Sequence, residues 1–259
     1  MKYTFVLMIV LCMLVSQLSA QSPPKNMKMI KGGTYVPLYG SDSLPVTIQD
    51  FYMDKFQVTN EEYIEFVKSN PEWKKSRVRK IFADQNYLKH WTGDTSLGKN
   101  ENQLKRSPVT NVSWFAAKAY CSCQGKRLAS IDEWEYTARA SETKPDASND
   151  AAFYQRSLDW YSKPAPLILP PVDSAFKNYY GISGLIGLVW EWNSDFNSSL
   201  LVGESRANNG IDRQLFCGAG SSGSKDTGNY AAYMRYAFRT SLKANYTVSS
   251  LGFRCVKNK

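Results

Sequence analysis

The residues of this chain best suited to redox or metal chemistry are its five cysteines and its single histidine, His90. Cys12 lies within an N-terminal apolar run, and the other four are Cys121, Cys123, Cys217 and Cys255. One residue separates Cys121 from Cys123, whereas paired zinc ligands are usually separated by about two to four residues. Without Cys12, four cysteines remain. In an oxidising compartment an even number of cysteines favours disulfides, so we expect these four to form bridges or to be buried thiols, and we do not expect a zinc site.

A second group of residues alternates aromatic and cationic side chains near the C-terminus: Tyr230, Tyr233, Arg235, Tyr236, Phe238 and Arg239. Together with Ser221 they could line a cleft for an anionic or extended peptide ligand, because guanidinium groups bind anions and aromatic rings supply contact area. The same alternation occurs where a strand packs one face and leaves the other in water. Both interpretations stay open at this point.

His90 precedes Trp91, and we expect it to be a surface or packing residue. A single histidine cannot supply the ligands of a non-haem iron site. The chain also has no nucleophile-elbow motif, so the presence of serine, histidine and aspartate is poor evidence for a hydrolase.

The chain is basic, with 32 Lys and Arg against 23 Asp and Glu and a formal net charge of +9. Its densest cationic run is Lys74, Lys75, Arg77, Arg79 and Lys80. Such a run could contact phosphates or acidic polymers, but it is also typical of a solvated face. No nucleic-acid-binding motif accompanies it, so we expect no nucleic-acid partner.

The N-terminus has the pattern of a secretory signal, with Lys2, an apolar run over residues 5–15 and the small pair Ser19-Ala20. We expect residues 1–20 to be removed, 21–27 to form a flexible lead-in and 28–259 to form one domain. The apolar run is shorter than the roughly 20 residues of a membrane span, and we expect no stable span elsewhere. The expected location is periplasmic or extracellular.

Hydrophobic patterning predicts short strands and a few helices. The predicted strands cover residues 29–38, 51–58, 184–192, 235–242 and 251–256. The predicted helices begin at Thr59 or Asn60, at Ser113, and at Ser130, where Glu133 completes a capping box. Residues 71–108 show no sustained periodicity and predict a surface excursion, and the chain after residue 138 is rich in loops. Helices packed on short, irregularly connected strands predict an α+β domain.

Six segments of the chain carry a recognisable pattern: FYMDKFQVTNEEY at 51–63, PVTNVSW at 108–114, AYC at 119–121 with GKRL at 125–128, EWEY at 133–136, VWEW at 189–192 with Asp195, and LGFRC at 251–255. In type, order and spacing they resemble the formylglycine-generating enzyme, or sulfatase-modifying factor, family. One segment would be weak evidence, but six in order cover nearly all of residues 28–259. The resemblance implies a modified C-type-lectin-like fold, α+β with little regular secondary structure.

The resemblance also implies a disulfide between the cysteine of the AYC helix, here Cys121, and the cysteine of the final strand, here Cys255. Such a bridge would close a loop of well over a hundred residues and contribute about 4 to 5 kcal/mol in the chain-entropy model. Cys123 and Cys217 have no partner in the family pattern, so they form a possible second bridge or remain buried thiols.

Oxidising members of this family convert a substrate cysteine to formylglycine with molecular oxygen, using two nearby cysteines that bind copper(I). Thiolates select this soft ion over harder metals. In this chain the corresponding stretch, residues 220–235, contains no cysteine, and Cys217 would have to serve alone. We therefore expect neither copper nor oxidation by that mechanism.

The resemblance further implies calcium, bound by main-chain carbonyls and the glutamate of the VWEW turn. Glu191 and the carbonyls of Gly187 and Val189 could serve, so calcium is a possible cofactor. Gly184 stands where the family has a side-chain ligand, which would leave the ion short of its usual six to eight oxygens. The alternative is that backbone N–H groups or an arginine hold Glu191.

Segments 213–220, 233–236 and 241–244 are similar to a subgroup encoded beside copper nitrite reductases and copper chaperones. We expect an exported, non-oxidising member that binds an unknown protein or small ligand in the former active-site cleft, as an accessory to a periplasmic metalloenzyme such as nitrite reductase. The alternatives are an active formylglycine-generating oxidase or related oxygen-dependent enzyme, and a lectin-like surface binder. Whether the chain is an enzyme stays open.

Overall fold

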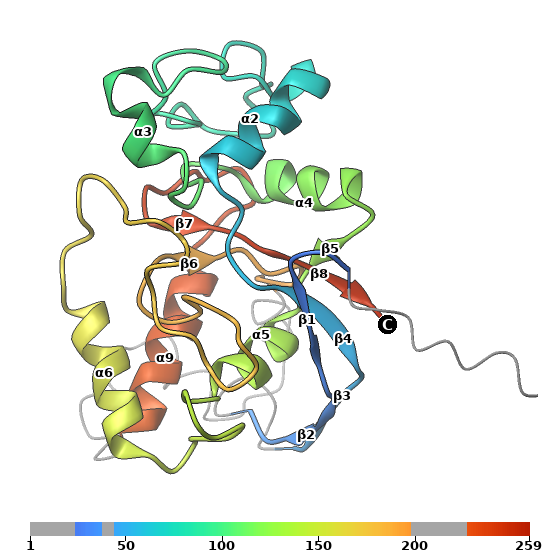
Figure 1. Ribbon diagram of the computed structural model, residues 1–259, viewed down its shortest axis with the longest axis vertical. Helices are drawn as coiled ribbons and strands as arrows, with labels where there is room; N and C mark the ends of the chain where they lie inside the picture. Colours follow the sequence, from blue (N-terminus) through green and yellow to red (C-terminus); the bar gives the residue numbers. More distant parts are fainter. Residues whose placement is uncertain (1–23, 38–43, 198–226) are drawn as a thin grey trace, which may run out of the picture.

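The computed structural model describes residues 24–37, 44–197 and 227–259, in which short strands and helices alternate (Figure 1). The strands are β1 (Met27–Ile30), β2 (Gly33–Tyr35), β3 (Val46–Ile48), β4 (Phe51–Asp54), β5 (Arg127–Leu128), β6 (Trp190–Glu191), β7 (Leu251–Gly252) and β8 (Cys255–Asn258). The helices are α2 (Asn60–Ser69), α3 (Glu101–Leu104), α4 (Trp114–Cys123), α5 (Ile131–Ala138), α6 (Ala151–Tyr161) and α9 (Thr227–Thr240), with 3-10 turns η1 (Pro71–Trp73) and η2 (Gly98–Asn100). The predicted α+β class is confirmed.

The largest sheet has four antiparallel strands in the order β1-β4-β8-β5. Its strand β8, from the C-terminus, lies between β4 and β5, with Val256 opposite both Met53 and Arg127. The two ends of the domain are therefore joined in one sheet (Figure 1). Strands β2 and β3 form an antiparallel pair, and β6 and β7 form a short parallel pair.

The three helices predicted from their caps are present as α2, α4 and α5. The Thr59 hydroxyl accepts from the Glu62 backbone N–H at 3.2 Å, and the Glu62 carboxylate accepts from the Thr59 N–H at 2.8 Å. Ser130 and Glu133 form the same reciprocal pair at 3.1 and 2.9 Å, and Ser113 caps α4. Each cap satisfies N–H groups that a helix start leaves without partners, so local sequence determines these boundaries.

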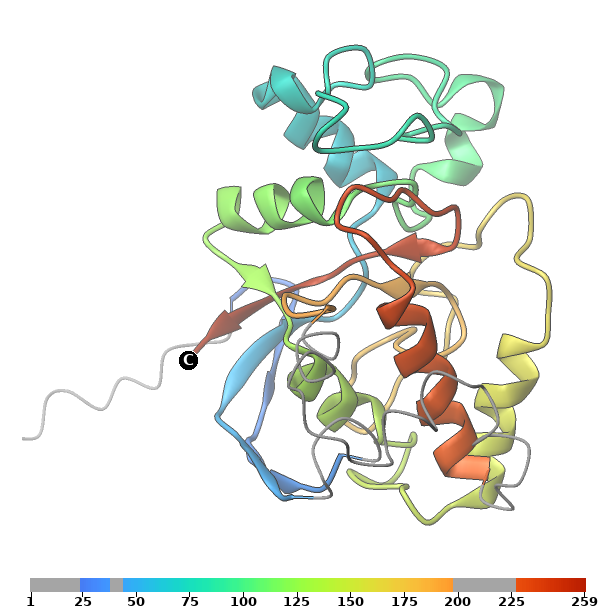
Figure 2. The same cartoon turned by 180° about the vertical axis from the view of Figure 1, so that it is seen from behind.

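Of the described helices, the short α3 and the longer α6 and α9 were not predicted. Residues 235–242, expected as a strand, lie mostly in α9, and the stretch expected to be loop-rich contains α6, which Asp150 caps. Helices α6 and α9 lie side by side (Figures 1 and 2). Over a few residues, alternating aromatic and cationic side chains fit a period of 2 and a period of 3.6 equally well, and alanines such as Ala231 and Ala232 favour the helix.

The predicted surface excursion of residues 71–108 is wrong for its central part. Tyr87, Leu88 and Trp91 are at most 3% exposed and pack into the core beside α2 and α4. The hydroxyls of Tyr63 and Tyr87 lie 2.7 Å apart. Aromatic residues without periodicity can still be core residues when a long loop folds back on itself, because burial then depends on tertiary contacts.

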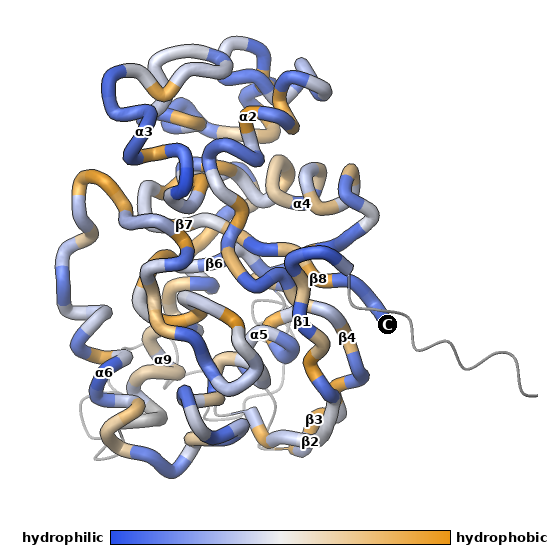
Figure 3. Tube along the Cα trace, in the orientation of Figure 1, coloured by the Kyte–Doolittle hydropathy of each residue, from blue (hydrophilic) through white to orange (hydrophobic). Residues whose placement is uncertain are grey.

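The remaining strand predictions differ from the structure in length. Residues 29–38 divide into parts of β1 and β2, separated at Gly32, where an added Cβ would lie 2.1 Å from the Ile48 carbonyl oxygen. Of residues 184–192, strand β6 takes only the last few. Figure 3 shows short apolar segments alternating with polar ones, consistent with a core assembled from many elements. Within the described ranges, no helix has the length and apolar character needed to span a membrane.

Candidate functional site

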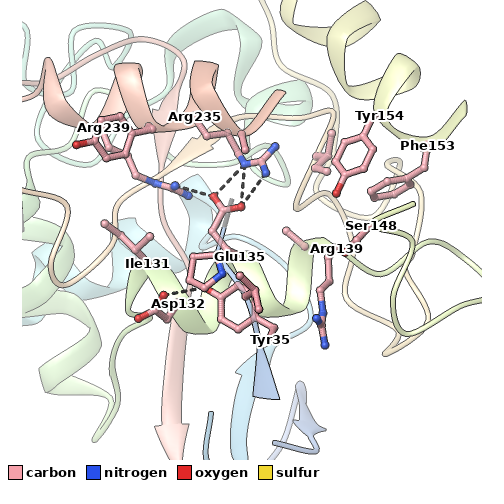
Figure 4. A pocket seen from close by; sticks show the side chains of 16 residues that line it. Tyr35, Ile131, Asp132, Glu135, Arg139, Ser148, Phe153, Tyr154, Arg235 and Arg239 are labelled. Atoms are coloured by element: carbon pink, nitrogen blue, oxygen red, sulfur yellow. Dashed lines mark hydrogen bonds and ion pairs between the residues drawn. The ribbon is translucent and has the colours of Figure 1, made fainter. Parts of the chain in front are cut away.

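A pocket of about 70 Å³ lies between helices α5 and α9, strand β2 and the start of α6 (Figure 4). Its lining residues are Tyr35, Val36, Pro37, Ile131, Asp132, Glu135, Ala138, Arg139, Ser148, Phe153, Tyr154, Ile186, Ala232, Arg235, Tyr236 and Arg239. We call it the α5–α9 pocket. Most of the lining is apolar or aromatic, and a few charged groups converge on one wall, which is the usual character of a small-molecule site.

The charged wall is built by two arginines of α9 that share one carboxylate of α5. Arg235 and Arg239 are four residues apart and therefore lie on the same helix face, from which both point at Glu135 (Figure 4). Arg235 Nη2 is 2.7 Å from Glu135 Oε2, and Arg239 Nη1 is 2.6 Å from Oε1. Arg235 Nη1 also donates to the Tyr161 hydroxyl at 3.1 Å, and Arg239 Nε to Asn193 Oδ1 at 3.0 Å.

This arrangement favours the charged forms of Glu135 and Arg235. Burial by itself would raise the pKa of Glu135, but Coulombic attraction and hydrogen bonds from Arg235 and Arg239 outweigh it and hold the pKa at about 2. The same ion pair raises the pKa of Arg235 although burial opposes this. The two arginines therefore use about half of their N–H donors within the protein, and the wall is less free to bind an anion than the sequence suggests.

The opposite side of the pocket is formed by tyrosines and a third arginine. The Tyr35 hydroxyl donates to Asp132 Oδ1 at 2.7 Å, and burial together with this bond raises the pKa of Tyr35. Arg139 lies with its guanidinium 4.5 Å from the Tyr136 ring centre and pairs with Asp146 at 3.2 Å. These contacts fix the side chains of the wall, so the pocket is largely preformed.

The predicted cleft residues are only partly brought together. Arg235, Tyr236 and Arg239 line the α5–α9 pocket, whereas Tyr230 is 37% exposed and its ring stacks on Tyr233 at 6.4 Å. Ser221 lies outside the described residues. Because the segment is a helix, the set divides between helix faces instead of lining one edge.

Sequence reasoning missed the carboxylate that organises this site. Glu135 belongs to the EWEY segment, two residues after the capping Glu133, and was not singled out. The sequence did contain a signal. Asp132 and Glu133 lie in the first helical turn, where acidic side chains stabilise the helix N-terminus, whereas Glu135 lies beyond that turn and its charge has no such local role. Its arginine partners come from a helix a hundred residues later, which only the fold reveals.

The glutamate of the VWEW turn is held by an arginine. Glu191 and Arg254 each have 1% of the side chain exposed, and Arg254 Nη2 is 2.7 Å from Glu191 Oε1. Arg254 Nε donates to both carboxylate oxygens at 2.8 and 3.0 Å. Trp134 Nε1 and Gln57 Nε2 donate to the same carboxylate at 3.0 and 2.7 Å. The carboxylate accepts about four hydrogen bonds at most, so these four N–H donors saturate it.

Gly184 explains how the glutamine reaches this turn. It has a positive φ of 67°, and an added Cβ would lie 3.2 Å from Gln57 Nε2, which donates to the Gly184 carbonyl at 2.8 Å. Gln57 Oε1 is buried without a partner among the described residues, but one oxygen is far from the six to eight that calcium needs. The side chains around Glu191 therefore do not fit a calcium ion well. Calcium at Gly187, Val189 and Glu191 stays a prediction.

The expected disulfide between Cys121 and Cys255 is present and links α4 to β8 across 134 residues of sequence. Cys123 is an exposed free thiol at the end of α4, 3.5 Å from Asn70 Oδ1. Cys217 lies outside the described residues, so a bridge from Cys217 to Cys123 stays a prediction. Within the described part of the chain, no group of three or more metal-binding side chains comes together.

His90 packs against the core and does not join either site. Its Nε2 lies 3.0 Å from Asn60 Oδ1, which also accepts from Trp91 Nε1 at 2.8 Å. Burial lowers the pKa of His90 to about 4, and Nδ1 is buried without a partner in the described structure. A neutral, partly buried imidazole in this position is a packing residue, as expected from the sequence.

The chain matches the family model of the sulfatase-modifying factor enzyme 1-like domain over residues 14–259 and belongs to this family. Among its relatives, the formylglycine-generating enzyme of Mus musculus is 27% identical, over 81% of this chain and 66% of the mouse protein. The formylglycine-generating enzyme of Bos taurus is 27% identical, over 90% of this chain and 75% of its own length. The inactive C-alpha-formylglycine-generating enzyme 2 of Bos taurus is also 27% identical, over 64% of this chain and 69% of that protein.

Solved structures with a similar chain path include PvdO from Pseudomonas aeruginosa and CarF. PvdO is 17% identical, with a TM-score of 0.45 over 90% of this chain and 94% of its own. CarF is 19% identical, with a TM-score of 0.47 over 90% of this chain and 98% of its own. Among the relatives, some are named formylglycine-generating enzymes and others are named inactive.

Proposed function

We propose that this protein is an exported, non-oxidising member of the sulfatase-modifying factor family that binds a small ligand or one side chain of a protein partner in the α5–α9 pocket. The observation that carries the proposal is the position of the cysteines. An inactive homologue among the relatives supports the same conclusion.

A two-thiolate copper site needs two free cysteines that can approach each other, and the described part of the chain holds one free cysteine, Cys123. Cys121 and Cys255 are joined to each other and buried. Cys123 lies at the end of α4, beside Asn70, and does not line the α5–α9 pocket. In the sequence, Cys217 stands just before residues 220–235, which contain no cysteine, and a single thiolate is a poor copper(I) site.

The pocket itself suits binding rather than redox chemistry. Its volume of about 70 Å³ is far below the few hundred Å³ of a drug-sized ligand site, so it fits one side chain or a small molecule. The Arg235, Arg239 and Glu135 cluster supplies fixed charge on one wall, and Tyr35, Tyr154 and Phe153 supply apolar contact on the others. A ligand with an apolar body and one polar end would match this distribution.

Copper(I) titration of the reduced protein, with Cys217→Ser as the control, tests the non-oxidising assignment. We expect no tight stoichiometric binding, and we expect no formylglycine by mass spectrometry when the protein is incubated with a cysteine-containing sulfatase peptide, copper and oxygen. Tight copper binding that Cys217→Ser abolishes, together with peptide oxidation, would overturn the proposal in favour of an oxidase.

The binding assignment is tested by changing the pocket without touching its ion pairs. Ala232 lines the pocket and is 7% exposed, so Ala232→Phe should fill it, while Ala151→Phe makes the same change at an exposed position. In a saturation-transfer NMR screen of small amphipathic compounds, we expect hits that bind wild type and Ala151→Phe but not Ala232→Phe. Hits that bind all three proteins equally would place the site elsewhere.

Export and an accessory role complete the proposal. The signal pattern of residues 1–20 supports cleavage before Gln21, which N-terminal sequencing of the secreted protein checks. The subgroup resemblance makes a periplasmic metalloenzyme such as nitrite reductase the first partner to test. The test compares the metal content and activity of that enzyme produced with and without this protein. Equal values in the two cases would argue against the accessory role.

A further inference from the structure

The cationic run of residues 74–80 lies on a different part of the molecule from the α5–α9 pocket. It follows η1 in the lobe that also contains α2 and α3, and this lobe lies over α4 in both views of the fold (Figures 1 and 2). Four of the cations around it, Arg77, Arg79, Lys80 and Lys118 of α4, are exposed, and Lys74 is half-buried. The fold therefore adds Lys118, distant in sequence, to the cluster.

Aromatic rings connect the two parts of this surface. The Arg79 guanidinium lies 5.4 Å from the centre of the Phe82 ring, and the Phe82 and Phe115 rings are 5.4 Å apart. Phe115 contacts Trp114 at 5.4 Å, and Lys118 Nζ lies 4.8 Å from the Trp114 ring. The rings are half-buried and form a continuous row, with Arg79 over one end and Lys118 over the other. We call these rings and the five cations the basic–aromatic face.

The cations of this face have no internal salt-bridge partner in the described part of the chain. With Lys75 of the same run, six cations against the nearby carboxylates Glu72, Asp84 and Asp94 leave a net charge of +3. Asp94 is already engaged, because its carboxylate accepts from the Ser76 N–H and hydroxyl at 2.8 and 2.7 Å. Asp84 is turned away and bonds to Thr247. The excess positive charge therefore faces solvent.

A purely solvated face would not need an aromatic floor. Arginine and aromatic side chains are the residue types enriched at protein interfaces, and a ring under a cation restricts where that cation can point. Ile81, beside the cations, is 64% exposed and adds an apolar contact. From this combination we propose that the basic–aromatic face is a docking surface for a carboxylate-rich segment of a partner protein, on a face separate from the α5–α9 pocket.

Charge complementarity makes two features of this interaction measurable. Attraction between exposed charges is screened within about 10 Å at 0.1 M salt, so binding should weaken steeply between about 50 and 300 mM salt. Each exposed charge contact is worth up to about fivefold in affinity, so removing two cations should weaken binding by about tenfold.

The test is fluorescence anisotropy with a fluorescein-labelled oligoglutamate peptide and the full mature protein. Arg79→Gln/Lys118→Gln removes two cations of the face. Lys68→Gln/Lys105→Gln removes the same charge at an exposed and a half-buried lysine that already pair with Glu65 at 2.7 Å and Glu101 at 3.3 Å. We expect salt-sensitive binding that the first double variant weakens by about tenfold and the control by less than about twofold.

Three results would overturn the proposal. The first is absence of peptide binding at about 50 mM salt. The second is equal weakening by both double variants, which would indicate general attraction to a basic protein. The third is binding of a sulfated glycan or an oligothymidine through Arg79 and Lys118 that is tighter than binding of the oligoglutamate peptide. Equal melting temperatures of the two double variants ensure that the comparison reports the surface and not folding.

Discussion

Loss of the Arg254 guanidinium should be the most damaging single change among the buried polar groups of this protein. Arg254 donates three hydrogen bonds to Glu191, at 2.7 to 3.0 Å. It also donates to the carbonyl oxygens of Asp54, Lys55 and Ser183 at 2.8 to 3.3 Å. Arg254→Met keeps much of the side-chain volume but leaves a buried carboxylate with only Trp134 and Gln57 as side-chain donors.

Removing one partner of a buried ion pair typically costs about 3 to 5 kcal/mol, because the other charge stays buried without compensation. The carbonyls that lose a donor add to this, at about 1 kcal/mol or more each. A domain of ordinary stability has only about 5 to 15 kcal/mol in total. We therefore expect Arg254→Met to lose at least about 4 kcal/mol and to be close to unfolded at 37 °C.

Urea unfolding followed by tryptophan fluorescence, with the disulfide intact, measures this change. Arg127→Met is the matched control, because Arg127 makes the same kind of bidentate pair with Glu133 but has 40% of its side chain exposed. A half-exposed bridge is worth about 1 kcal/mol or less. Equal losses for the two variants, or a loss under about 1 kcal/mol for Arg254→Met, would refute the assignment of Arg254 as the group that holds Glu191.

Three further predictions concern the disulfide, His90 and calcium. Replacing Cys121 and Cys255 together by alanine opens a loop of 134 residues and should lower stability by about 5 kcal/mol in the chain-entropy model; an unchanged urea midpoint would contradict it. The folded pKa of His90 is about 4 and its unfolded pKa is about 6.5, so the unfolded chain binds more protons between these values. Stability should therefore fall by about 3 kcal/mol as the pH drops from 6.5 to 4, and the difference between wild type and His90→Gln isolates this contribution; parallel pH curves would contradict it. Because donors saturate Glu191, replacing EGTA by millimolar calcium should shift the melting temperature by less than about 1 °C, whereas a site filled at a hundred times its Kd would add about 2.7 kcal/mol and several degrees.

Local signals were sufficient wherever a residue acts on its own neighbours. Thr59 with Glu62 and Ser130 with Glu133 are capping boxes that mark helix starts in the sequence and in the structure alike. The α+β class and the family also follow from short segments in order. The pairing of Cys121 with Cys255 was available only through the family resemblance, because spacing alone permits several pairings.

Local signals failed where a segment depends on its packing partner. The chain around Arg235 and Arg239 is compatible with a strand or a helix, and it is a helix in which the two arginines meet Glu135 on α5. Residues around Trp91 look like a surface loop but are buried against α2 and α4. In both cases the deciding energy comes from burial or ion pairing between segments that are tens of residues to 104 residues apart in sequence, which no window of neighbouring residues contains.

The sequence by itself therefore determined the family, the helix caps, the net positive charge and the lack of cysteine in residues 220–235. These are properties of residue identity and of spacing along the chain. Only the tertiary structure decided that Arg254 neutralises Glu191, that Glu135 occupies the arginines of the α5–α9 pocket, and that Lys118 joins the cationic run. Each of these facts depends on which charged side chains, distant in sequence, lie close together in the folded protein, and the packing of the whole domain determines this.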